Sequence, residues 1–498
     1  MTPYFLGIDN GGTLSKAALF RSDGVEVASA SRKVAIIESH PGWSERSADV
    51  MWQDTAAAIR EVLENSAIDP AAIAAIACTG HGNGLYLVDA AGAPVRHAIN
   101  SMDGRAAAIA ARWKQDGTAA KALPLTAQCV WPAQPNALLV WLREYEPEAV
   151  ARASAVLFAK DFTRLKLTGE IRAELTDMSG SSLMNVVTGQ YDDAVLELFG
   201  ILDFKHLLPP LNKSHDLCGG VTPQAAAATG LAVGTPVAGG MFDIDACGLA
   251  SGIVDEAQMS LVSGTWGNNQ YIARTPLLDK DLFMTSCYSI PGWFLMLEGS
   301  PTSASNLEWF VAQFLDGMAP PNGKSRYAHC DELVAELGEP SLDTPIFLPF
   351  LYGCNLPAPA AAAFVGLKAR HSRQDMLRAV YEGVVFSHFT HLKRLLQFRP
   401  VPASIRFTGG AARSAVWVKM FADCFQIPIE IPAGSELGAL GAAIAAAVAI
   451  GHYPDYPAAV RAMTRIDHRH APDPTLGDIY QLKFSRYLAT AKALAAIP

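Results

Sequence analysis

The sequence predicts an α/β fold built from two halves of comparable size. Strand-like segments and small-residue turns alternate over the first thirty residues, and helical and strand-like segments alternate after them. The opening strand–turn–strand pattern then returns near residue 255. At roughly 100–200 residues per domain, a chain of 498 residues forms two or three globular units. We therefore expect two domains, 1–252 and 253–498, with a cleft between them.

The N-terminal half is expected to open with a β-meander. Its first turn is Asn10-Gly11-Gly12-Thr13 and its second is Ser22-Asp23-Gly24. The expected elements are, in chain order, strands at 4–9, 16–20 and 25–30, a helix at 44–66, a strand at 71–79 and a hairpin that begins at 85–89.

The C-terminal half repeats the opening hairpin. Residues 258–263 and 268–273 are strand-like, and Gly264-Thr265-Trp266-Gly267 between them is typical of a tight turn. Residues 437–451 carry no charge but are too few to cross a bilayer. Because this stretch consists mainly of Ala and Gly, we expect a buried helix that packs closely on a sheet.

Composition excludes several classes of function. Half of the residues are hydrophobic, which excludes disorder, and Asp and Glu outnumber Lys and Arg by 48 to 39, which disfavours nucleic acid and anionic membranes as partners. Eight cysteines without a C-x-x-C pair indicate neither a disulfide framework nor a thiolate zinc site. The opening residues lack the features of a signal peptide. We therefore expect a cytoplasmic protein.

Three small-residue turns, each after a strand, are candidate phosphate-binding sites. They are Asp9-Asn10-Gly11-Gly12-Thr13, Ser263-Gly264-Thr265 and Thr408-Gly409-Gly410-Ala411-Ala412. Glycine lets the main chain approach a phosphate and aim successive N–H groups at it. Each turn alone is more often a plain hairpin turn. The three together favour binding of a phosphorylated ligand.

The joint pattern resembles the actin-like sugar kinases. Gly7-Ile8-Asp9-Asn10-Gly11-Gly12-Thr13 with Lys16 resembles their first phosphate motif, Ser263-Gly264-Thr265-Trp266 their second, and Phe407-Thr408-Gly409-Gly410-Ala411 their adenosine motif. Three further runs resemble the FGGY carbohydrate kinases more narrowly: Lys160-Asp161 with Leu167-Thr168-Gly169-Glu170, Leu348-Pro349-Phe350-Leu351-Tyr352-Gly353, and Glu382-Gly383-Val384-Val385-Phe386. The resemblance covers nearly the whole chain.

Within that family, two runs are most like the L-xylulose kinase branch of ketopentose kinases. They are Ser300-Pro301-Thr302-Ser303 with 306–310, and Val385-Phe386-Ser387-His388 with Thr390-His391-Leu392. The chain departs from the family at the sugar-facing loop, often Gly-Gln-Met-His-Gly, which here is Gly80-His81-Gly82-Asn83-Gly84. It also replaces the usual G-E-R-x-P by residues 353–357. Sugar preference therefore stays open.

The resemblance implies two actin-like (ribonuclease H-like) ATPase domains and transfer of phosphate from ATP to a sugar hydroxyl. It makes Asp243 the general base, and Asp245 is a second candidate because both would share one face of an extended strand. Asp9 would hold the Mg²⁺ that accompanies ATP. The residues expected to line the sugar site are His81, Asn83, Asp103 and Trp131. The residues expected to bind nucleotide and phosphate are Gly11, Gly12, Thr13, Lys16, Gly264, Thr265, Gly409, Gly410, Ala411 and Ser414.

The leading hypothesis is an ATP-dependent kinase for an L-xylulose-like ketopentose. Alternatives are a kinase for D-xylulose, a ribulose or a polyol, and a sugar-binding pseudokinase without transfer activity. A hydride-transferring enzyme is a remote third possibility, because the loop at 80–84 lacks the last glycine of a dinucleotide fingerprint. The expected partners are a small sugar and ATP, and a homodimer is one candidate assembly. His388 and His391 are expected to fall on a helix, as packing or helix-end residues.

Overall fold

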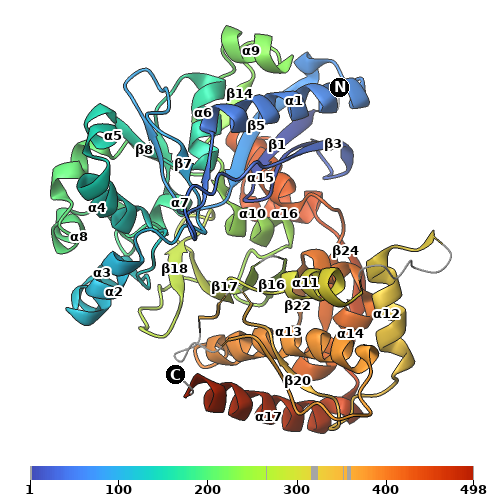
Figure 1. Ribbon diagram of the computed structural model, residues 1–498. Coiled ribbons are helices and arrows are strands. Elements are labelled where there is room, and N and C mark those ends of the chain that lie inside the picture. The colour runs from blue at the N-terminus through green and yellow to red at the C-terminus, as the bar shows by residue number, and fades with distance from the viewer. Residues whose placement is uncertain (1–2, 265, 316–322, 352, 356–360, 497–498) are drawn as a thin grey trace. The chain divides into compact units, whose positions relative to one another are not determined.

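The computed structural model describes residues 3–496 except 265, 316–322, 352 and 356–360. The chain divides into two compact units (Figure 1). Unit 1 consists of Met1–Val254, Ile272–Met296 and Gly434–Arg465, and unit 2 of Asp255–Tyr271, Leu297–Ala433 and Ile466–Pro498. Unit 1 thus includes two segments from the second half of the sequence. The domain boundary after residue 252 stays a prediction.

Unit 1 is built on a seven-stranded sheet whose main path has the order β13-β14-β5-β1-β2-β3. Strand β1 pairs with β2 antiparallel, which sets Asp9 opposite Lys16, and with β5 parallel. The predicted meander is confirmed. The strands are β1 (Tyr4–Asn10), β2 (Leu14–Arg21), β3 (Glu26–Lys33), β5 (Ile73–Gly80), β13 (Leu217–Gly220), β14 (Pro236–Ala238) and β15 (Met241–Phe242), which pairs with β5. Shorter strands are β4 (Glu45–Arg46), β6 (Tyr86–Val88), β7 (Ala98–Ile99), β8 (Ala155–Leu157), β9 (Ala173–Glu174), β10 (Met184–Asn185), β11 (Gln190–Tyr191), β12 (Leu211–Asn212) and β18 (Met284–Cys287).

Helix α1 covers one face of this sheet. It begins four residues later than predicted, because the Ser47 side chain accepts a hydrogen bond from the Val50 amide and caps the helix. Its Ile59 and Val62 are buried in one core cluster with Ile8 of β1. The helices of unit 1 are α1 (Ala48–Ser66), α2 (Ala107–Gln115), α3 (Thr118–Thr126), α4 (Pro135–Tyr145), α5 (Pro147–Arg152), α6 (Ala159–Thr168), α7 (Leu175–Ser179), α8 (Asp193–Leu198), α9 (Pro223–Thr229), α10 (Asp243–Ala250), α15 (Leu437–Ala449) and α16 (Tyr456–Met463).

The Ala- and Gly-rich helix α15 lies directly against β1, as predicted. A Cβ atom added to Gly7 would stand 1.9 Å from the Ala439 carbonyl oxygen. On the helix, a Cβ added to Gly441 would stand 2.2 Å from the carbonyl oxygen of Ala246 in α10. Both distances are far below any real contact, so glycine is required for the two backbones to approach this closely.

The segment before the proposed base differs from the prediction of a continuing strand. Strand β15 ends at Phe242, and α10 begins at Asp243. An acidic residue in the first turn stabilises a helix by interacting with its N-terminal dipole, which favours the helix here. Residues at positions i and i+2 of a helix, such as Asp243 and Asp245, are separated by about 200° around its axis. The expectation that Asp243 and Asp245 share one face was therefore wrong.

The second seven-stranded sheet has the order β18-β19-β17-β16-β22-β23-β24, and most of its residues after β18 belong to unit 2. Strand β16 pairs with β17 antiparallel and with β22 parallel, which repeats the arrangement of β1, β2 and β5. The predicted repetition of the opening hairpin is confirmed. The strands are β16 (Met259–Ser263), β17 (Gly267–Ala273), β19 (Phe294–Ser300), β22 (Ile405–Thr408), β23 (Ile429–Pro432) and β24 (Ile466–His470), with β20 (Ile346–Leu348) and β21 (Ala363–Val365) forming a separate pair.

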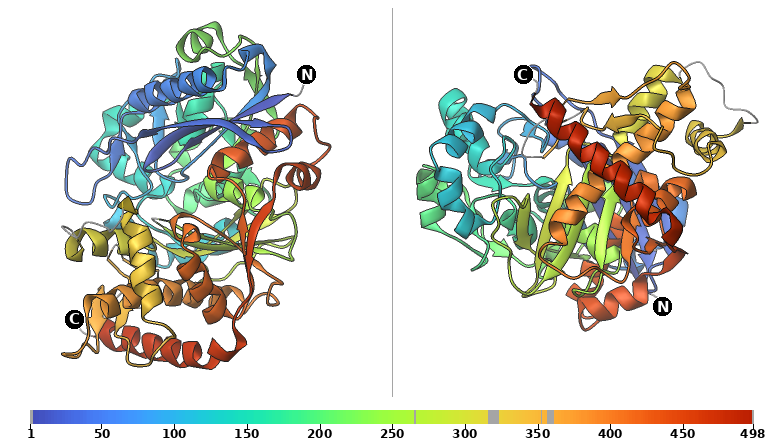
Figure 2. Two further views of the ribbon diagram at one scale, coloured as in Figure 1. Left: turned by 90° about the vertical axis from the view of Figure 1, so that its right-hand side faces the viewer. Right: turned by 90° about the horizontal axis from the view of Figure 1, so that it is seen from below.

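Helix α13 lies at the centre of unit 2. Most of its side chains after Leu377 are buried, including His388 and His391, which fall on the helix as predicted. Figure 2 shows α17 at the outer side of this unit, where it packs on α13 and α14. The helices are α11 (Ser305–Phe314), α12 (Arg326–Glu336), α13 (Arg373–Leu395), α14 (Ala415–Phe425) and α17 (Gly477–Ala495).

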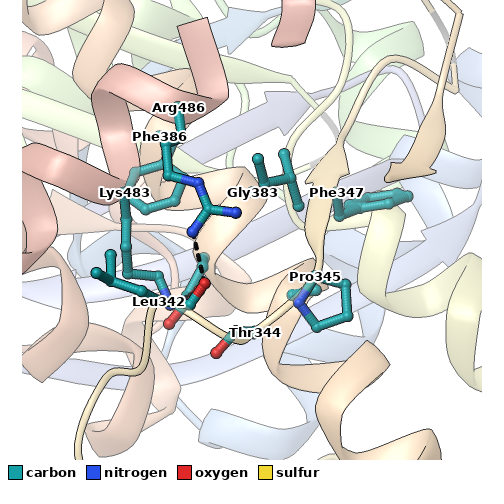
Figure 3. Close-up of a pocket in the computed structure, with 11 residues that line it drawn as sticks. Leu342, Thr344, Pro345, Phe347, Gly383, Phe386, Lys483 and Arg486 are labelled. Atoms are coloured by element: carbon teal, nitrogen blue, oxygen red, sulfur yellow. Dashed lines mark hydrogen bonds and ion pairs between the residues drawn. The ribbon is translucent and has the colours of Figure 1, made fainter. Parts of the chain in front are cut away.

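A small cavity of about 10 Å³ lies between β20, α13 and α17 (Figure 3). Beside it the Lys483 ammonium is 2.7 Å from Oε2 of Glu382, whose Oε1 is 3.2 Å from Nε of Arg378. A Cβ atom at Gly383 would stand 2.5 Å from the Phe347 carbonyl oxygen. The cavity has room for about one water molecule. The Glu382-Gly383 motif therefore serves packing and a buried ion-pair network in unit 2.

Candidate active site

The first phosphate turn of unit 1 leaves its backbone open. Gly12 and Thr13 are exposed, and a Cβ atom at Gly12 would meet no atom within 4 Å. Arg46 of β4 donates from Nη1 to the Gly11 carbonyl oxygen at 3.1 Å and from Nη2 to Ser15 Oγ at 3.3 Å. Arg46 was not among the site residues predicted from the sequence. Its guanidinium holds the two ends of the turn while the main chain between them remains accessible.

Asp9, Lys16 and Glu436 form a charged group beside this turn. Lys16 Nζ is 2.9 Å from Glu436 Oε2, and a Cβ atom at Gly438 would stand 2.5 Å from Asp9 Oδ2. Burial raises the pKa of Asp9 to about 6, against the influence of Lys16. Burial acts to lower the pKa of Lys16, but the carboxylates of Asp9 and Glu436 outweigh it and raise that pKa. Asp9 Oδ1 is buried without a hydrogen-bond partner in the described structure.

Asp243 and Asp245 have different surroundings although both belong to the first turn of α10. Asp243, the first helical residue, is partly exposed, and its pKa lies well above the ordinary value because of burial and of repulsion from Asp9 and Asp177. Asp245 is fully buried, and its Oδ1 accepts a hydrogen bond of 2.9 Å from the Ser289 amide. Of the two residues, Asp243 is the less buried, and the Asp245 carboxylate is engaged with the Ser289 amide.

The loop at 80–84 lies next to the start of α10. A Cβ atom at Gly82 would stand 2.3 Å from the ring of Phe242 and 2.6 Å from Asp177 Oδ1. Asn83 has a φ of 58°, a left-handed conformation that Asn tolerates, and its buried Oδ1 has no hydrogen-bond partner within the described chain. His81 Nε2 is 3.1 Å from the Tyr86 hydroxyl. Burial lowers the pKa of His81 to about 3, so the ring is neutral.

Asp103 and Trp131 have other surroundings. Both oxygens of Asp103 already have partners, since Oδ1 accepts from Arg105 Nε at 2.8 Å and Oδ2 from the Ser44 amide at 2.7 Å. The Trp131 ring is partly exposed and lies 6.0 Å from that of Phe283. Asp103 thus has a structural role in this conformation. The sugar contacts of both residues stay predictions.

In unit 2 the second phosphate turn and the adenosine turn are neighbours. Val262 pairs with Thr408 in the parallel strands β16 and β22, so both turns follow the same sheet edge. Gly409 has a φ of 91°, and a Cβ atom there would stand 2.4 Å from the Ser263 carbonyl oxygen. The exposed Gly410 would place a Cβ atom in open space. Thr265 lies outside the described residues.

Two other predicted nucleotide residues are engaged in the fold of unit 2. Ser414 caps α14 by accepting from the Trp417 amide, and its hydroxyl donates to Asp331 Oδ1 at 2.6 Å. Ala411 is buried. Of the predicted nucleotide residues in unit 2, Gly264, Gly409 and Gly410 therefore lie at the two neighbouring turns. The Gly410 backbone is exposed, and the Gly409 backbone packs against Ser263.

A buried ionic network, which includes the Lys160-Asp161 motif, supports the segment before Asp243. Lys160 Nζ is 3.1 Å from an oxygen of Asp161 and 3.1 Å from one of Asp177. Arg164 pairs with Asp161 at 3.0 Å and donates to the Gly239 carbonyl oxygen at 2.6 Å. The network therefore connects α6 to Gly239, which precedes β15, and to Asp177, which touches the loop at Gly82.

Two family matches decide what kind of protein this is. Residues 4–249 match the N-terminal domain of the FGGY family of carbohydrate kinases, and residues 259–450 match its C-terminal domain. The chain belongs to the FGGY family of carbohydrate kinases. It is a phosphotransferase that acts on an alcohol group of a sugar, and its two-domain α/β fold is that of the actin-like ATPases.

Individual relatives agree with this family. The chain is 39% identical to the L-xylulose/3-keto-L-gulonate kinase of Escherichia coli (strain K12), with 99% of this chain and 98% of the relative covered. It is 38% identical to a probable L-xylulose kinase of Pasteurella multocida (strain Pm70), with 99% of both chains covered. The crystal structure of xylulose kinase from Rhodospirillum rubrum superposes with a TM-score of 0.86 at 28% identity over 99% of each chain. The predicted likeness to the L-xylulose kinase branch is confirmed.

The described residues contain no group of three or more His, Cys, Asp or Glu side chains arranged to hold a metal ion. An ion that accompanies a nucleotide needs only one or two carboxylates, because phosphates and water supply the other ligands. Asp9, with its buried unpartnered oxygen, fits that requirement.

Across the described ranges, we find no helix with the length and apolar character of a membrane span.

Proposed function

We propose that this kinase transfers the γ-phosphoryl group of ATP to a hydroxyl of an L-xylulose-like ketopentose, with Asp243 as the general base. The observation that carries the proposal is the position of Asp243. It is a partly exposed carboxylate at the start of α10, and the loop at 80–84 touches the preceding residue, Phe242. Relatives named L-xylulose kinases at 36–39% identity support the acceptor class.

The surroundings of Asp243 suit proton abstraction. A sugar hydroxyl is a poor nucleophile, and a carboxylate within hydrogen-bond reach orients it and accepts its proton as the new P–O bond forms. Burial and the carboxylates of Asp9 and Asp177 raise the pKa of Asp243, which makes it a stronger base than an exposed Asp. The N-terminus of α10 favours the ionised form and opposes that shift.

Asp9 and Lys16 are the residues proposed to handle the nucleotide charge in unit 1. Asp9 would hold Mg²⁺ directly or through water, and the ion would supply positive charge that offsets the charge of the nucleotide phosphates. Lys16 keeps its positive charge because two carboxylates raise its pKa. The exposed amides of Gly12 and Thr13 would donate to phosphate oxygens. In unit 2, Gly264 and Gly410 are proposed to contact phosphate and adenosine.

His81 and Asn83 are proposed to bind the sugar. Asn83 Oδ1 is buried without a partner, and a sugar hydroxyl would satisfy it. His81 is neutral, so it would offer a hydrogen bond without placing a second charge near Asp243. Asp103 and Trp131 stay candidates for the same site.

The test is a coupled ADP-release assay across a panel of acceptors at fixed ATP and Mg²⁺. The panel contains L-xylulose, 3-keto-L-gulonate, D-xylulose, both ribuloses, erythritol and gluconate. We expect the highest kcat/KM with L-xylulose or 3-keto-L-gulonate and no turnover after metal chelation. A clear preference for erythritol or gluconate would contradict the ketopentose assignment. Turnover that persists without divalent metal would contradict the assigned role of Asp9.

A further inference from the structure

A chain of buried hydrogen bonds lies behind the second phosphate turn. Ser263, the last residue of β16, has its Oγ 2.8 Å from Oγ of Ser303, which in turn is 2.8 Å from Nε2 of His388. On the other side of the ring, His388 Nδ1 is 3.2 Å from Oδ1 of Asn269 on β17. All four side chains are at least nine-tenths buried. No step of the proposed phosphoryl transfer uses them.

The direction of the hydrogen bonds follows from their chemistry. The Asn269 amide nitrogen donates to the Glu298 carbonyl oxygen, so its Oδ1 faces the histidine and accepts from Nδ1–H. Burial lowers the pKa of His388 to about 3, so the ring is neutral and its Nε2 accepts from the Ser303 hydroxyl. Ser303 Oγ then accepts from the hydroxyl of Ser263. Every donor in this chain has one acceptor.

The chain contacts both strands that flank the turn. Ser263 immediately precedes Gly264, and its carbonyl oxygen lies against Gly409 of the adenosine turn. On β17, a Cβ atom at Gly267 would stand 3.0 Å from His388 Cε1, so the ring also packs on the residue where that strand begins. One imidazole on α13 therefore holds the end of β16 and the start of β17 in register.

We propose that His388 is a positioning residue for the second phosphate turn, acting through Ser303 on β16 and through Asn269 on β17. It fixes the separation of Ser263 and Gly267, the two strand residues that flank the turn. The inference rests on the proposed nucleotide role of this turn. It gives a function to two sequence runs, one around Ser303 and one around His388, that the catalytic proposal leaves unused.

The same helix provides a matched control. His391 lies three residues further along α13 and is equally buried. Its Nε2 is 2.8 Å from Ser300 Oγ, and its Nδ1 is 2.9 Å from Glu298 Oε2. Ser300 and Glu298 both belong to β19 rather than to the hairpin that carries the turn. Both pairs are a buried serine hydroxyl bonded to Nε2 of a buried histidine, and they differ in the partner of Nδ1, which is an amide for His388 and a carboxylate for His391. Only the His388 pair reaches the second phosphate turn.

The experiment compares Ser303→Ala with Ser300→Ala in the full-length protein. Each removes one buried hydroxyl that is bonded to a histidine, so we expect similar losses in melting temperature. Mg·ADP affinity by calorimetry and the KM for ATP should worsen about fivefold to thirtyfold in Ser303→Ala and should not change in Ser300→Ala. The KM for the sugar should stay constant in both. Ser303→Cys retains a weak donor of similar size and should give an intermediate nucleotide affinity.

Three results would overturn the proposal. Unchanged Mg·ADP affinity in Ser303→Ala is one, and equal losses in the two alanine variants are another, because they indicate a purely structural role. Absence of the order wild type, Ser303→Cys, Ser303→Ala is the third. If Ser303→Ala proves unstable, Ser303→Cys against Ser300→Cys carries the same comparison. A wild-type protein that binds no Mg·ADP would instead refute the proposed function, so the two failures are distinguishable.

Discussion

The hairpin β1–β2, which carries the first phosphate turn, and the hairpin β16–β17, which carries the second, have the same backbone arrangement. They differ in that ionisable side chains lie beside the first turn and neutral side chains lie behind the second. In both, an antiparallel hairpin pairs with a parallel strand on its other side. The turn between β1 and β2 has the ionisable side chains of Asp9, Lys16 and Glu436 beside it. The turn between β16 and β17 is backed by the neutral chain that ends at Asn269.

This difference indicates that the two turns contribute different interactions to the proposed reaction. A charged turn suits a metal ion and the transferred phosphate, whereas a neutral, rigidly backed turn suits main-chain donors that need a fixed geometry. Unit 1 also carries Asp243 and the loop at 80–84, so the proposed function assigns acceptor chemistry and charge neutralisation to one unit. In that proposal the two hairpins share a backbone arrangement, and the residues packed behind each one set its role.

The largest expected effect is on the charged side, from Asp243→Asn. This change keeps the shape and removes the base, so kcat should fall by at least about a hundredfold while ATP binding by calorimetry persists. The control is Asp245→Asn. Because the Asp245 carboxylate is buried and accepts a hydrogen bond from the Ser289 amide, this change should affect stability more than turnover. Near-normal turnover in Asp243→Asn together with loss in Asp245→Asn would transfer the role of base to Asp245.

The next effect concerns the acceptor. Asn83→Ala would leave sugar hydroxyls without a partner. The resulting fall in kcat/KM for the sugar should correspond to a loss of about 1–3 kcal/mol in transition-state stabilisation, with the KM for ATP unchanged. Because Asn83 has a positive φ, alanine also adds backbone strain. Asn83→Gly avoids that strain and should show the same kinetic loss. A normal sugar profile in Asn83→Gly would remove this residue from the site.

A pH effect separates the two hairpins further. With a pKa of about 6, Asp9 is protonated below that pH and would lose the charge proposed to hold the metal. The Mg²⁺ concentration for half-maximal rate should therefore rise as pH falls through 6, approaching about tenfold per pH unit. Asp9→Asn should have a high Mg²⁺ requirement at every pH. A requirement that does not change between about pH 5 and pH 8 in the wild type would argue against Asp9 as the ligand.

The smallest expected effect lies on the neutral side, at two adjacent glycines. Gly410→Val places its side chain in open space, so folding should be normal while the KM for ATP rises about fivefold to tenfold and the sugar KM stays constant. Gly409→Ala should instead lower the melting temperature, because its Cβ would overlap Ser263 and its φ is positive. Parallel losses of ATP and sugar affinity in a folded Gly410→Val protein would show that the turn is misassigned.

Local pattern was enough to predict much of the fold. The opening hairpin of each half, the existence of helix α1 but not its first residue, and the Ala- and Gly-rich helix α15 all follow from periodicity, turn residues and side-chain size. The family and its L-xylulose branch were predicted from the resemblance of several short motifs to those of known members, and the family match confirms them. Each element and each motif depends on residues that are close in sequence, so the sequence by itself determined them.

Contacts between distant residues were decided only by the tertiary structure. Alternation predicted a strand through Asp245, but packing of α10 against α15 and the dipole of a helix start made it a helix. Arg46, Asp177 and Glu436 gave no local signal, because each acts on a partner tens or hundreds of residues away. The same is true of His388, whose link to Ser263 exists only because α13 folds behind the hairpin. Burial, which sets the pKa values of Asp9 and Asp243, is likewise a property of the whole fold.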